Sequence, residues 1–352
     1  MDITPYLQLL RDKNGSDLFF TVGAPVKIKI EGAINSVGKT MLTGELVQAA
    51  AYGIMTEQQI KGFEDTMECD FAIALPDKSV RFRVNIFRQR GEVAMVLRRI
   101  PAEIPNIDEL GLPEILKELV MHKRGLILMV GATGSGKSTT LAAMINERNK
   151  EMTGHILSIE DPVEFSHPNL KSIVNQREVG VDTLNYRNAL RASLREAPDV
   201  ILIGEIRDRE TMEAALELCN TGHLAISTLH ANNSNQAMER VINLFPQELH
   251  KQLFMDLSLN LRAVVSQRLV KGMDGKRIAA IEILVNSPHI ADLILKGEIH
   301  ELKEAMEGSG TRGMQTFDMA LHTLFKEERI ELEEALGNAD SRTNLEAKIN
   351  FG

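Results

Sequence analysis

The sequence predicts an α/β protein: a small amino-terminal α/β domain, then a larger domain built on a parallel β-sheet, and a helical carboxy-terminal tail. The chain has 352 residues, which is long enough for two hydrophobic cores. Three prolines fall between residues 101 and 113, and such a stretch continues neither a helix nor a central strand. Beyond it, apolar runs alternate with helical segments, as in parallel sheets covered on both faces.

The amino-terminal domain, residues 1–99, is expected to contain short helices and strands. Within residues 80–86, apolar and polar side chains alternate. On a strand, this places Phe82, Val84 and Ile86 on one face. Arg81 and Arg83 then lie on the other face. The expected elements are a helix over 2–12, strands over 17–22 and 26–30, helices over 43–52 and 56–63, and strands over 70–75, 80–86 and 92–100.

Residues 100–113 form the expected linker, and residues 114–352 form the second domain. From about residue 287 to residue 352 the sequence reads as helical, with a glycine-rich break at 307–313. In a parallel sheet, ligand-binding groups gather at the carboxyl ends of the strands, so the ends of the apolar runs are the places to search. These runs cover 126–130, 156–159, 200–203, 224–226 and 278–285.

Composition narrows the class of protein. Apolar residues make up 43% and charged residues 25% of the chain, as in soluble globular proteins. The net charge of −9 argues against a general nucleic-acid binder. Two cysteines, Cys69 and Cys219, form neither a disulfide framework nor a four-cysteine zinc site. No signal peptide or long apolar run is present, so we expect a reduced, cytosolic protein that could still dock on a membrane complex.

Residues 131–138 fit the pattern G-x-x-x-x-G-K-[ST], which binds nucleotide phosphates when it joins a strand to a helix. The glycines let backbone N–H groups converge on the β-phosphate. Lys137 would reach the β- and γ-phosphates, and the Ser138 hydroxyl would bind Mg²⁺. We therefore expect a nucleoside triphosphate with Mg²⁺ at Gly131, Ala132, Thr133, Gly134, Ser135, Gly136, Lys137, Ser138 and Thr139.

Two acidic residues follow apolar runs of the second domain. Glu205 comes after residues 200–203, and Glu160 comes directly after residues 156–159. We assign Glu205 to polarising the attacking water or to the Mg²⁺ shell, and Glu160 to a supporting metal or water contact. An acid after a strand is also a common helix cap, and for Glu160 this alternative stays open.

Two histidines bracket the run at 224–226. His230 lies at its carboxyl end, where it could sense the γ-phosphate, and a satisfied polar side chain is the equal alternative. His223 lies at the opposite end, where it would only pack or bridge. Neither has a metal-type partner nearby in the sequence, so no zinc site is expected.

Arginines recur in two patterns. Arg187, Arg191 and Arg195 are spaced by four residues, so a helix there would carry a basic stripe. Ring ATPases often take a cationic side chain from a neighbouring subunit, because charge spreads over the γ-phosphate oxygens in the transition state. We favour Arg81 and Arg83 of the first domain for this role. For any single arginine, a solvated face with local ion pairs is an equal alternative.

The motifs in their order resemble a known family. The chain is similar, over essentially its whole length, to the secretion-superfamily ATPases of type IV pilus and type II secretion machines. Pilus-extension and secretion members carry a longer amino-terminal region and a four-cysteine metal site, so the resemblance is to the retraction branch, the PilT/PilU family. The motifs are GATGSGKSTT at 131–140, SIEDPVEF at 158–165, DVILIGEIRD at 199–208 and TGHLAISTLHANN at 221–233.

One segment separates the two kinds of retraction ATPase. PilT carries the signature AIRNLIRE near its carboxy-terminal end, whereas residues 289–298 here read HIADLILKGE and lack both arginines. With VGVDT at 179–183 and HANN at 230–233, this looks more like PilU. The resemblance thus implies an accessory motor that works with a PilT-like paralogous motor.

The resemblance implies more than spacing does. It implies a PAS-like first domain, a RecA-like ATPase domain with a helical carboxy-terminal region, and a homohexameric ring that hydrolyses ATP with Mg²⁺. The matching site positions are the loop 131–138, Glu160 with Asp161, Glu205, and His223 with His230. Arginines of the first domain are expected to complete a neighbour's site. The ring would be cytoplasmic, peripheral at the inner membrane, contacting the pilus platform protein and acting indirectly on the pilin filament.

Two other functions compete with this motor. One is a regulatory ring that binds ATP and acts mainly as the partner of another retraction motor. The other is a RecA-like translocase on nucleic acid, which the net charge of −9 and the 4% aromatic content disfavour. We expect no nucleic-acid partner.

Overall fold

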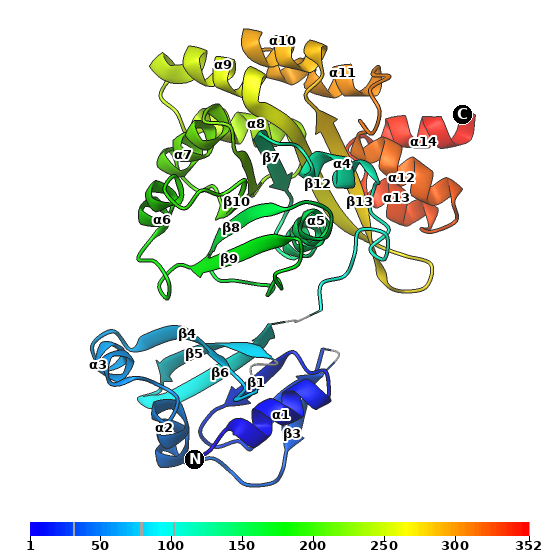
Figure 1. Cartoon of the computed structure of the whole chain (residues 1–352). Coiled ribbons are helices and arrows are strands. Elements are labelled where there is room, and N and C mark those ends of the chain that lie inside the picture. Colours follow the sequence, from blue (N-terminus) through cyan, green and yellow to red (C-terminus); the bar gives the residue numbers. More distant parts are fainter. Residues whose placement is uncertain (31, 78–79, 101–102, 352) are drawn as a thin grey trace. The chain divides into compact units, whose positions relative to one another are not determined.

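The computed structural model describes residues 1–30, 32–77, 80–100 and 103–351. The described chain forms two compact units, Met1–Glu103 with Glu164–Ser166, and Ile104–Val163 with His167–Gly352, coloured along the sequence in Figure 1. Residues 101, 102 and 352, which belong to the predicted linker and tail, lie outside the described residues. We describe each unit by itself.

The amino-terminal unit is a mixed α/β unit with an antiparallel sheet. Its strand order is β3-β2-β1-β6-β5-β4, and each neighbouring pair runs antiparallel. The helices are α1 (Thr4–Asp12), α2 (Gly44–Tyr52) and α3 (Glu57–Thr66); the strands are β1 (Asp17–Phe20), β2 (Val26–Ile30), β3 (Ala33–Val37), β4 (Glu68–Ala74), β5 (Arg81–Gln89) and β6 (Glu92–Ile100).

Local sequence explains these elements. Thr43 and Thr56 cap α2 and α3, because each side-chain oxygen accepts from a backbone N–H of the first turn. On β5 the predicted alternation is confirmed: Phe82 and its apolar partners on the same face are fully buried. Strand β3 was not predicted, because its residues are mostly exposed and lack an apolar stripe.

The carboxy-terminal unit is built on a seven-stranded sheet of order β13-β12-β7-β11-β10-β8-β9. Six strands run parallel, which confirms the predicted parallel sheet. The strands are β7 (Gly125–Val130), β8 (Gly154–Glu160), β9 (Ser172–Glu178), β10 (Val200–Glu205), β11 (Leu224–Leu229), β12 (Leu261–Lys271) and β13 (Arg277–Val285).

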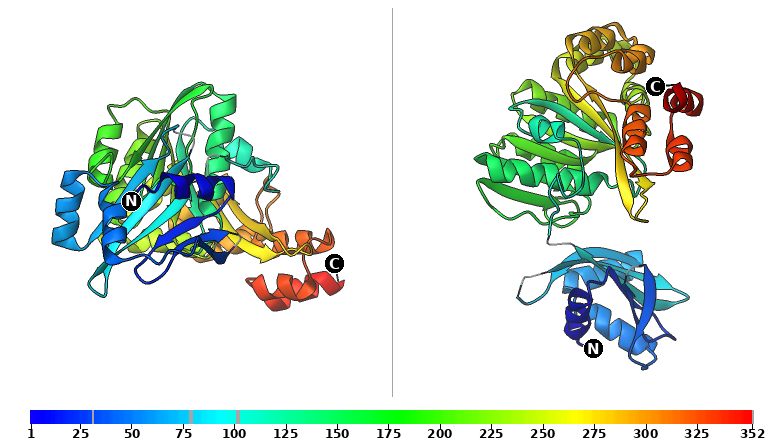
Figure 2. Two further views of the ribbon diagram at one scale, coloured as in Figure 1. Left: turned by 90° about the horizontal axis from the view of Figure 1, so that it is seen from below. Right: turned by 90° about the vertical axis from the view of Figure 1, so that its right-hand side faces the viewer.

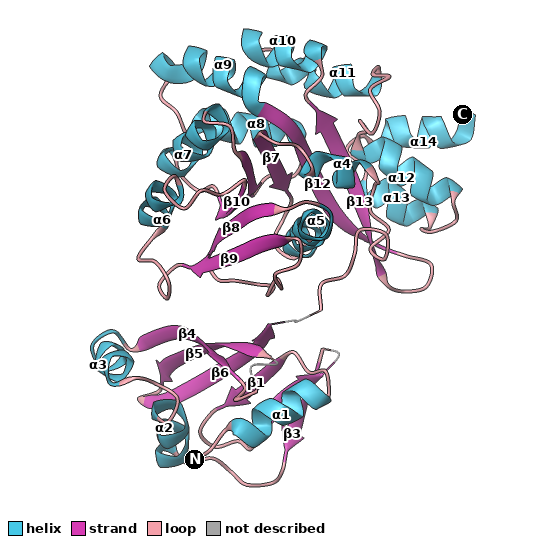
Figure 3. Ribbon diagram, in the orientation of Figure 1, coloured by secondary structure: helices cyan, strands magenta, loops and turns pink. Residues whose placement is uncertain are grey.

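Helices cover both faces of this sheet (Figure 3). Strand β7 shows why, since Leu126 and Leu128 join one core cluster and Ile127 and Met129 join another, as the alternation along a strand requires. The second cluster includes α4 (Ile115–Val120) and α5 (Lys137–Glu151). The first includes α6 (Tyr186–Ser193), α7 (Arg209–Asn220), α8 (Ser234–Asn243), α9 (His250–Asn260), α10 (Pro288–Lys296) and α11 (Leu302–Glu307).

The predicted helical tail is confirmed. Its last three helices are α12 (Phe317–Lys326), α13 (Leu332–Asn338) and α14 (Arg342–Phe351), and they lie beside β12 and β13 (Figure 2). Their core contains Phe317 together with Val270 of β12 and Ala280 of β13. Among the described residues, no helix is both long enough and apolar enough to cross a bilayer.

Three sequence-based expectations need correction. The run at 278–285 is a strand, but β13 pairs antiparallel with β12 at the sheet edge. Strands β9 and β12 were not predicted. Helix α6 ends at Ser193, so the predicted helical stripe is wrong for Arg195, which lies in the turn that follows.

Candidate nucleotide site

The glycine-rich loop joins β7 to α5 at the edge where the parallel strands end. All three of its glycines have backbone angles that favour glycine, with φ of +153° at Gly131, +78° at Gly134 and +86° at Gly136. A Cβ on Gly131 would lie 2.5 Å from the Ser135 hydroxyl oxygen. The loop therefore curls so tightly that only glycine fits, and it ends at the amino terminus of α5, where anions bind.

Lys137 closes the curl. Its Nζ donates to the carbonyl oxygens of Gly131 and Ala132, at 2.8 Å each, and the residue is buried. Ser135 is buried as well, and its hydroxyl oxygen has no hydrogen-bond partner among the described residues. A buried hydroxyl without a partner, beside a buried ammonium and a helix start, fits an anionic phosphate group.

Glu205 ends β10 at an irregularity of the sheet. The register between β10 and β11 shifts between Ile203 and Glu205, and such bulges re-aim side chains. The Glu205 side chain is 13% exposed; its Oε2 lies 2.7 Å from Nε of Arg207 and its Oε1 lies 3.2 Å from Nε2 of His230. The carboxylate is thus held in one orientation by partners from two strand ends.

Glu160 ends the neighbouring strand, β8. Its Oε1 accepts from Oγ of Ser158 at 2.6 Å and from Nε2 of Gln176 at 3.2 Å. A Cβ on Gly204 would come within 3.3 Å of the Glu160 Cα, so this residue and the bulge that carries Glu205 are direct neighbours. Glu160 therefore lies beside Glu205, as the sequence predicted, and does not cap a helix.

The two histidines lie at opposite ends of β11, as predicted. His230 faces Glu205, and together with Gly131, Ala132 and Asn232 it lines a pocket of about 400 Å³. His223, by contrast, contacts Thr221 Oγ1 at 3.0 Å through Nδ1. Only His230 is therefore brought to the phosphate loop.

The Tyr186 side chain packs against Gly204 in the bulge. A Cβ on Gly204 would lie 2.5 Å from the Tyr186 hydroxyl oxygen, so glycine is required there. Burial, and next the nearby charge of Asp161, raise the pKa of the Tyr186 phenol above its ordinary value.

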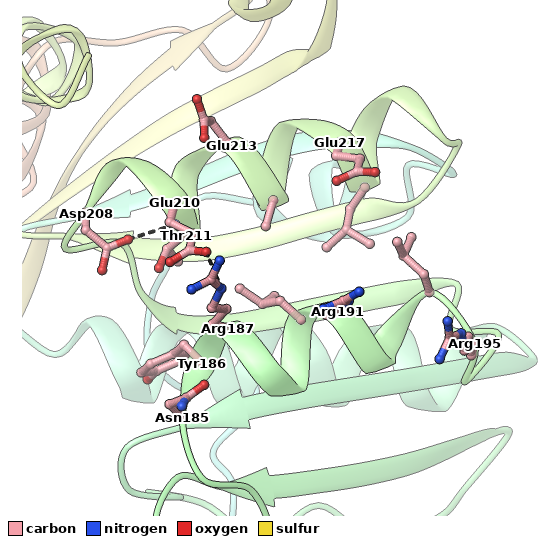
Figure 4. Close-up of a pocket in the computed structure, with 14 residues that line it drawn as sticks. Asn185, Tyr186, Arg187, Arg191, Arg195, Asp208, Glu210, Thr211, Glu213 and Glu217 are labelled. Carbon is pink, nitrogen blue, oxygen red and sulfur yellow. Dashed lines mark hydrogen bonds and ion pairs between the residues drawn. The ribbon is translucent and has the colours of Figure 1, made fainter. Parts of the chain in front are cut away.

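The predicted arginine stripe borders a different pocket. A pocket of about 860 Å³ lies between α6 and α7, and the side chains of Arg187, Arg191 and Arg195 line it (Figure 4). The Arg187 Nε lies 2.6 Å from Oε1 of Glu210 on α7. For Arg187 the structure thus shows the local ion pair that sequence reasoning gave as the alternative.

Arg81 and Arg83 belong to the amino-terminal unit. Both lie on the half-buried face of β5, and Nε of Arg83 is 3.8 Å from Oδ1 of Asp70 on β4. Their action on a nucleotide stays a prediction.

Sequence reasoning missed three side chains of the site. Arg207 and Gln176 hold the two acids, and Gln267 of β12 accepts from Thr140 of α5 at 2.7 Å. The available signal for Gln267 was a polar triplet, residues 266–268, between the apolar residues 263–265 and 269–270.

Comparison with known proteins places the chain among secretion ATPases. A family model described as Type II/IV secretion system protein matches residues 3–315. The type IV pilus ATPase PilU of Pseudomonas aeruginosa is 53% identical over 353 residues, covering 100% of this chain and 92% of that protein. The PilT retraction ATPase of the same organism is 42% identical over 345 residues, covering 98% and 100%.

A solved structure agrees with these relatives. The crystal structure of the pilus retraction motor PilT with bound ADP matches with a TM-score of 0.92 at 40% identity, covering 98% of this chain and 99% of that chain.

Proposed function

The chain belongs to the type II/IV secretion system family and is a type IV pilus retraction ATPase of the PilT/PilU kind; from this premise we propose that it is the accessory, PilU-like motor. The observation that carries the accessory assignment is the difference in identity between two proteins of one organism, 53% with PilU against 42% with PilT. Residues 289–298, which form most of α10, support it because they lack the arginines of the PilT signature.

ATP binds on the loop at 131–138 in this proposal. The backbone N–H groups cradle the β-phosphate, and Lys137 moves its ammonium from the carbonyl oxygens of Gly131 and Ala132 to the β- and γ-phosphates. The unpartnered Ser135 hydroxyl donates to a phosphate oxygen. Ser138, at the first turn of α5, and Thr139 complete the contacts.

Magnesium ion would be held by the Ser138 hydroxyl, with Glu205 and Glu160 at the neighbouring strand ends. Mg²⁺ in such sites takes one or two carboxylates and completes its shell with phosphates and water, so the two carboxylates with the Ser138 hydroxyl fit this ion. When bound, it neutralises charge on the β- and γ-phosphates.

Hydrolysis depends on Glu205. Its carboxylate orients the attacking water and receives a proton, while Arg207 and His230 keep the side chain in position. His230, at the mouth of the pocket beside the loop, senses the γ-phosphate. Glu160 supports the water through the hydrogen-bonded cluster it forms with Ser158 and Gln176.

The working assembly we propose is a homohexamer, with a PAS-like fold for the amino-terminal unit and Arg81 or Arg83 completing a neighbour's site. It is cytoplasmic and peripheral at the inner membrane. It acts with a PilT-like paralogous motor on the platform protein and so, indirectly, on the pilin filament, without a nucleic-acid partner.

Phosphate release by the purified protein tests this function. We expect turnover of ATP that requires Mg²⁺, is lost on chelation, and falls at least about a hundredfold in Lys137→Ala. Absence of turnover at every protein concentration, with ATP binding retained, would instead favour the regulatory ring.

A further inference from the structure

Strand β12 carries three consecutive polar residues, Ser266, Gln267 and Arg268, between the apolar residues 263–265 and 269–270. Ser266 and Gln267 are almost completely buried. Because side chains alternate along a strand, Gln267 faces one side of the sheet, and Ser266 and Arg268 face the other. The triplet therefore reaches both faces of the sheet from adjacent backbone positions.

Gln267 contacts the phosphate loop. Its Oε1 accepts from the Thr140 hydroxyl at 2.7 Å, and both residues are buried. A Cβ on Gly136 would lie 2.7 Å from the Gln267 Nε2, and a Cβ on Gly131 would lie 2.6 Å from the Gln267 carbonyl oxygen. Gln267 thus meets the loop at its first glycine, at its last glycine and in the first turn of α5.

Arg268 contacts the segment that carries His230. Its Nη2 donates to the carbonyl oxygen of Asn232 at 3.2 Å, and its Nη1 donates to the carbonyl oxygen of Asn338 at 2.6 Å. The guanidinium also lies 3.9 Å from the Phe317 ring centroid. One side chain therefore joins the loop after β11 to the carboxy-terminal helices.

Asp340 anchors this guanidinium. Its Oδ1 lies 2.6 Å from Nη2 of Arg268, and its Oδ2 lies 3.2 Å from Nζ of Lys303 on α11. Burial would raise the pKa of Asp340, but the two cations together hold it below its ordinary value. The carboxylate is therefore ionised at neutral pH. Lys303, which pairs with the same carboxylate, can serve as the control for Arg268.

We propose that Gln267 and Arg268 are paired positioning residues for ATP hydrolysis: Gln267 sets the phosphate loop, and Arg268 sets residues 230–233 against the carboxy-terminal helices. The inference rests on the ATPase function proposed above. Both side chains leave one paired strand at adjacent positions, so they fix the loop and the His230 segment relative to each other. Loss of the Arg268 contact removes one of the ties that hold the segment whose histidine lies beside Glu205, although Asn233 Nδ2 still donates to Asp340 Oδ2 at 3.4 Å.

A comparison of the variants Arg268→Lys and Lys303→Met tests the proposed positioning role of Arg268. Lysine keeps a cation for Asp340 but lacks the fork that reaches two carbonyl oxygens. We expect kcat to fall about tenfold in Arg268→Lys, with KM for ATP changed less than about twofold, because the loop contacts of Gln267 remain. Lys303→Met removes a cation from the same carboxylate and should leave kcat within about twofold. Equal kcat values in the two variants would overturn the role of Arg268.

Gln267 is tested through nucleotide affinity. Gln267→Met removes the acceptor and Thr140→Val removes the donor of the same hydrogen bond. Each variant should therefore raise KM for ATP about three- to tenfold. The double variant should do no more than the larger single one, because both changes remove the same contact, and Thr140→Ser should retain wild-type KM. Unchanged KM in Gln267→Met would overturn the role of Gln267.

A second readout separates this inference from the ATPase function itself. Hydrogen exchange of the amides at 230–233 should speed up in Arg268→Lys and stay at the wild-type rate in Lys303→Met. If wild type fails to hydrolyse ATP in the same assay, the proposed function fails, while the exchange rates still report whether Arg268 holds the segment. Equal exchange in all three proteins would contradict the positioning role.

Discussion

At the scale of single residues, the proposed chemistry depends on a carboxylate held from two sides. Glu205 receives Arg207 on one oxygen and His230 on the other, which leaves it pre-oriented at the strand end. Glu205→Gln keeps the shape of the side chain but cannot take a proton from water. We expect ATP turnover to fall about 10²- to 10⁴-fold while the Kd for a fluorescent ATP analogue changes little.

The matched control for this change is Glu210→Gln. Glu210 follows five residues later and pairs with Arg187 at the surface, where an ion pair contributes little. Its turnover should equal that of wild type within about twofold. Near-normal turnover in Glu205→Gln would remove Glu205 from the mechanism.

His167 gives a pH prediction. Burial lowers the pKa of His167 to about 4, below its ordinary value of 6.5 in an unfolded chain. The native state therefore resists protonation, so the stability contributed by neutral His167 is present above pH 6.5 and is lost as pH falls toward 4. At pH 5 the expected loss is about 2 kcal/mol.

Thermal unfolding of wild type and His167→Gln between pH 7 and pH 5 measures this effect. The variant cannot be protonated, so its melting temperature should fall less on acidification than that of wild type. Parallel curves for the two proteins would show that His167 does not control acid stability.

Residue spacing predicted the loop and both acids, but it left His230 undecided. The contact on which the proposed role of His230 rests joins it to Glu205, a residue 25 positions earlier in the chain, at the ends of two strands. Such a contact depends on strand order and on the bulge at Gly204, and neither can be read from one segment of sequence.

At the scale of elements, the bulge that ends β10 depends on Gly204. In Gly204→Ala the new Cβ would lie 2.5 Å from the Tyr186 hydroxyl oxygen, so either the tyrosine or the strand end must move. Overpacking of this kind typically costs about 1–3 kcal/mol. We expect both a lower melting temperature and reduced ATP turnover.

Tyr186→Phe removes the atom that would collide and serves as the paired variant. The double variant Gly204→Ala with Tyr186→Phe should recover part of the lost turnover and melting temperature. If it is no better than Gly204→Ala alone, the collision with the tyrosine is not what disturbs Glu205.

The strands that sequence reasoning missed share a cause. Strand β9 lies at the sheet edge and shows only a weak alternation of apolar and polar residues. The apolar pattern of β12 is interrupted by its polar triplet. Strand β12 is also the one that carries Gln267 and Arg268, so the departure from an apolar pattern marks functional contacts. The fully apolar strand β7 was predicted within one residue.

At the scale of the whole molecule, we propose that Arg81 or Arg83 of one subunit completes the nucleotide site of another subunit. The carboxy-terminal unit holds the phosphate loop, and the amino-terminal unit holds Arg81 and Arg83. If Arg83 acts on a neighbouring subunit, Lys137→Ala and Arg83→Ala proteins should each be inactive alone but recover turnover when mixed.

Random assembly of equal amounts of the two variants pairs an intact loop with an intact neighbouring arginine at about a quarter of the interfaces. The expected recovery is therefore about a quarter of wild-type turnover. A mixture no more active than its components would exclude Arg83 as the residue acting between subunits.

The central claim, that ATP hydrolysis at this loop drives pilus retraction, is tested most directly in the host. Deletion of the gene, followed by complementation with wild type or Lys137→Ala, can be scored by surface pili and twitching motility. We predict excess surface pili or lost twitching in the deletion strain, rescued by wild type and not by Lys137→Ala. Normal piliation and motility in the deletion strain would contradict the claim.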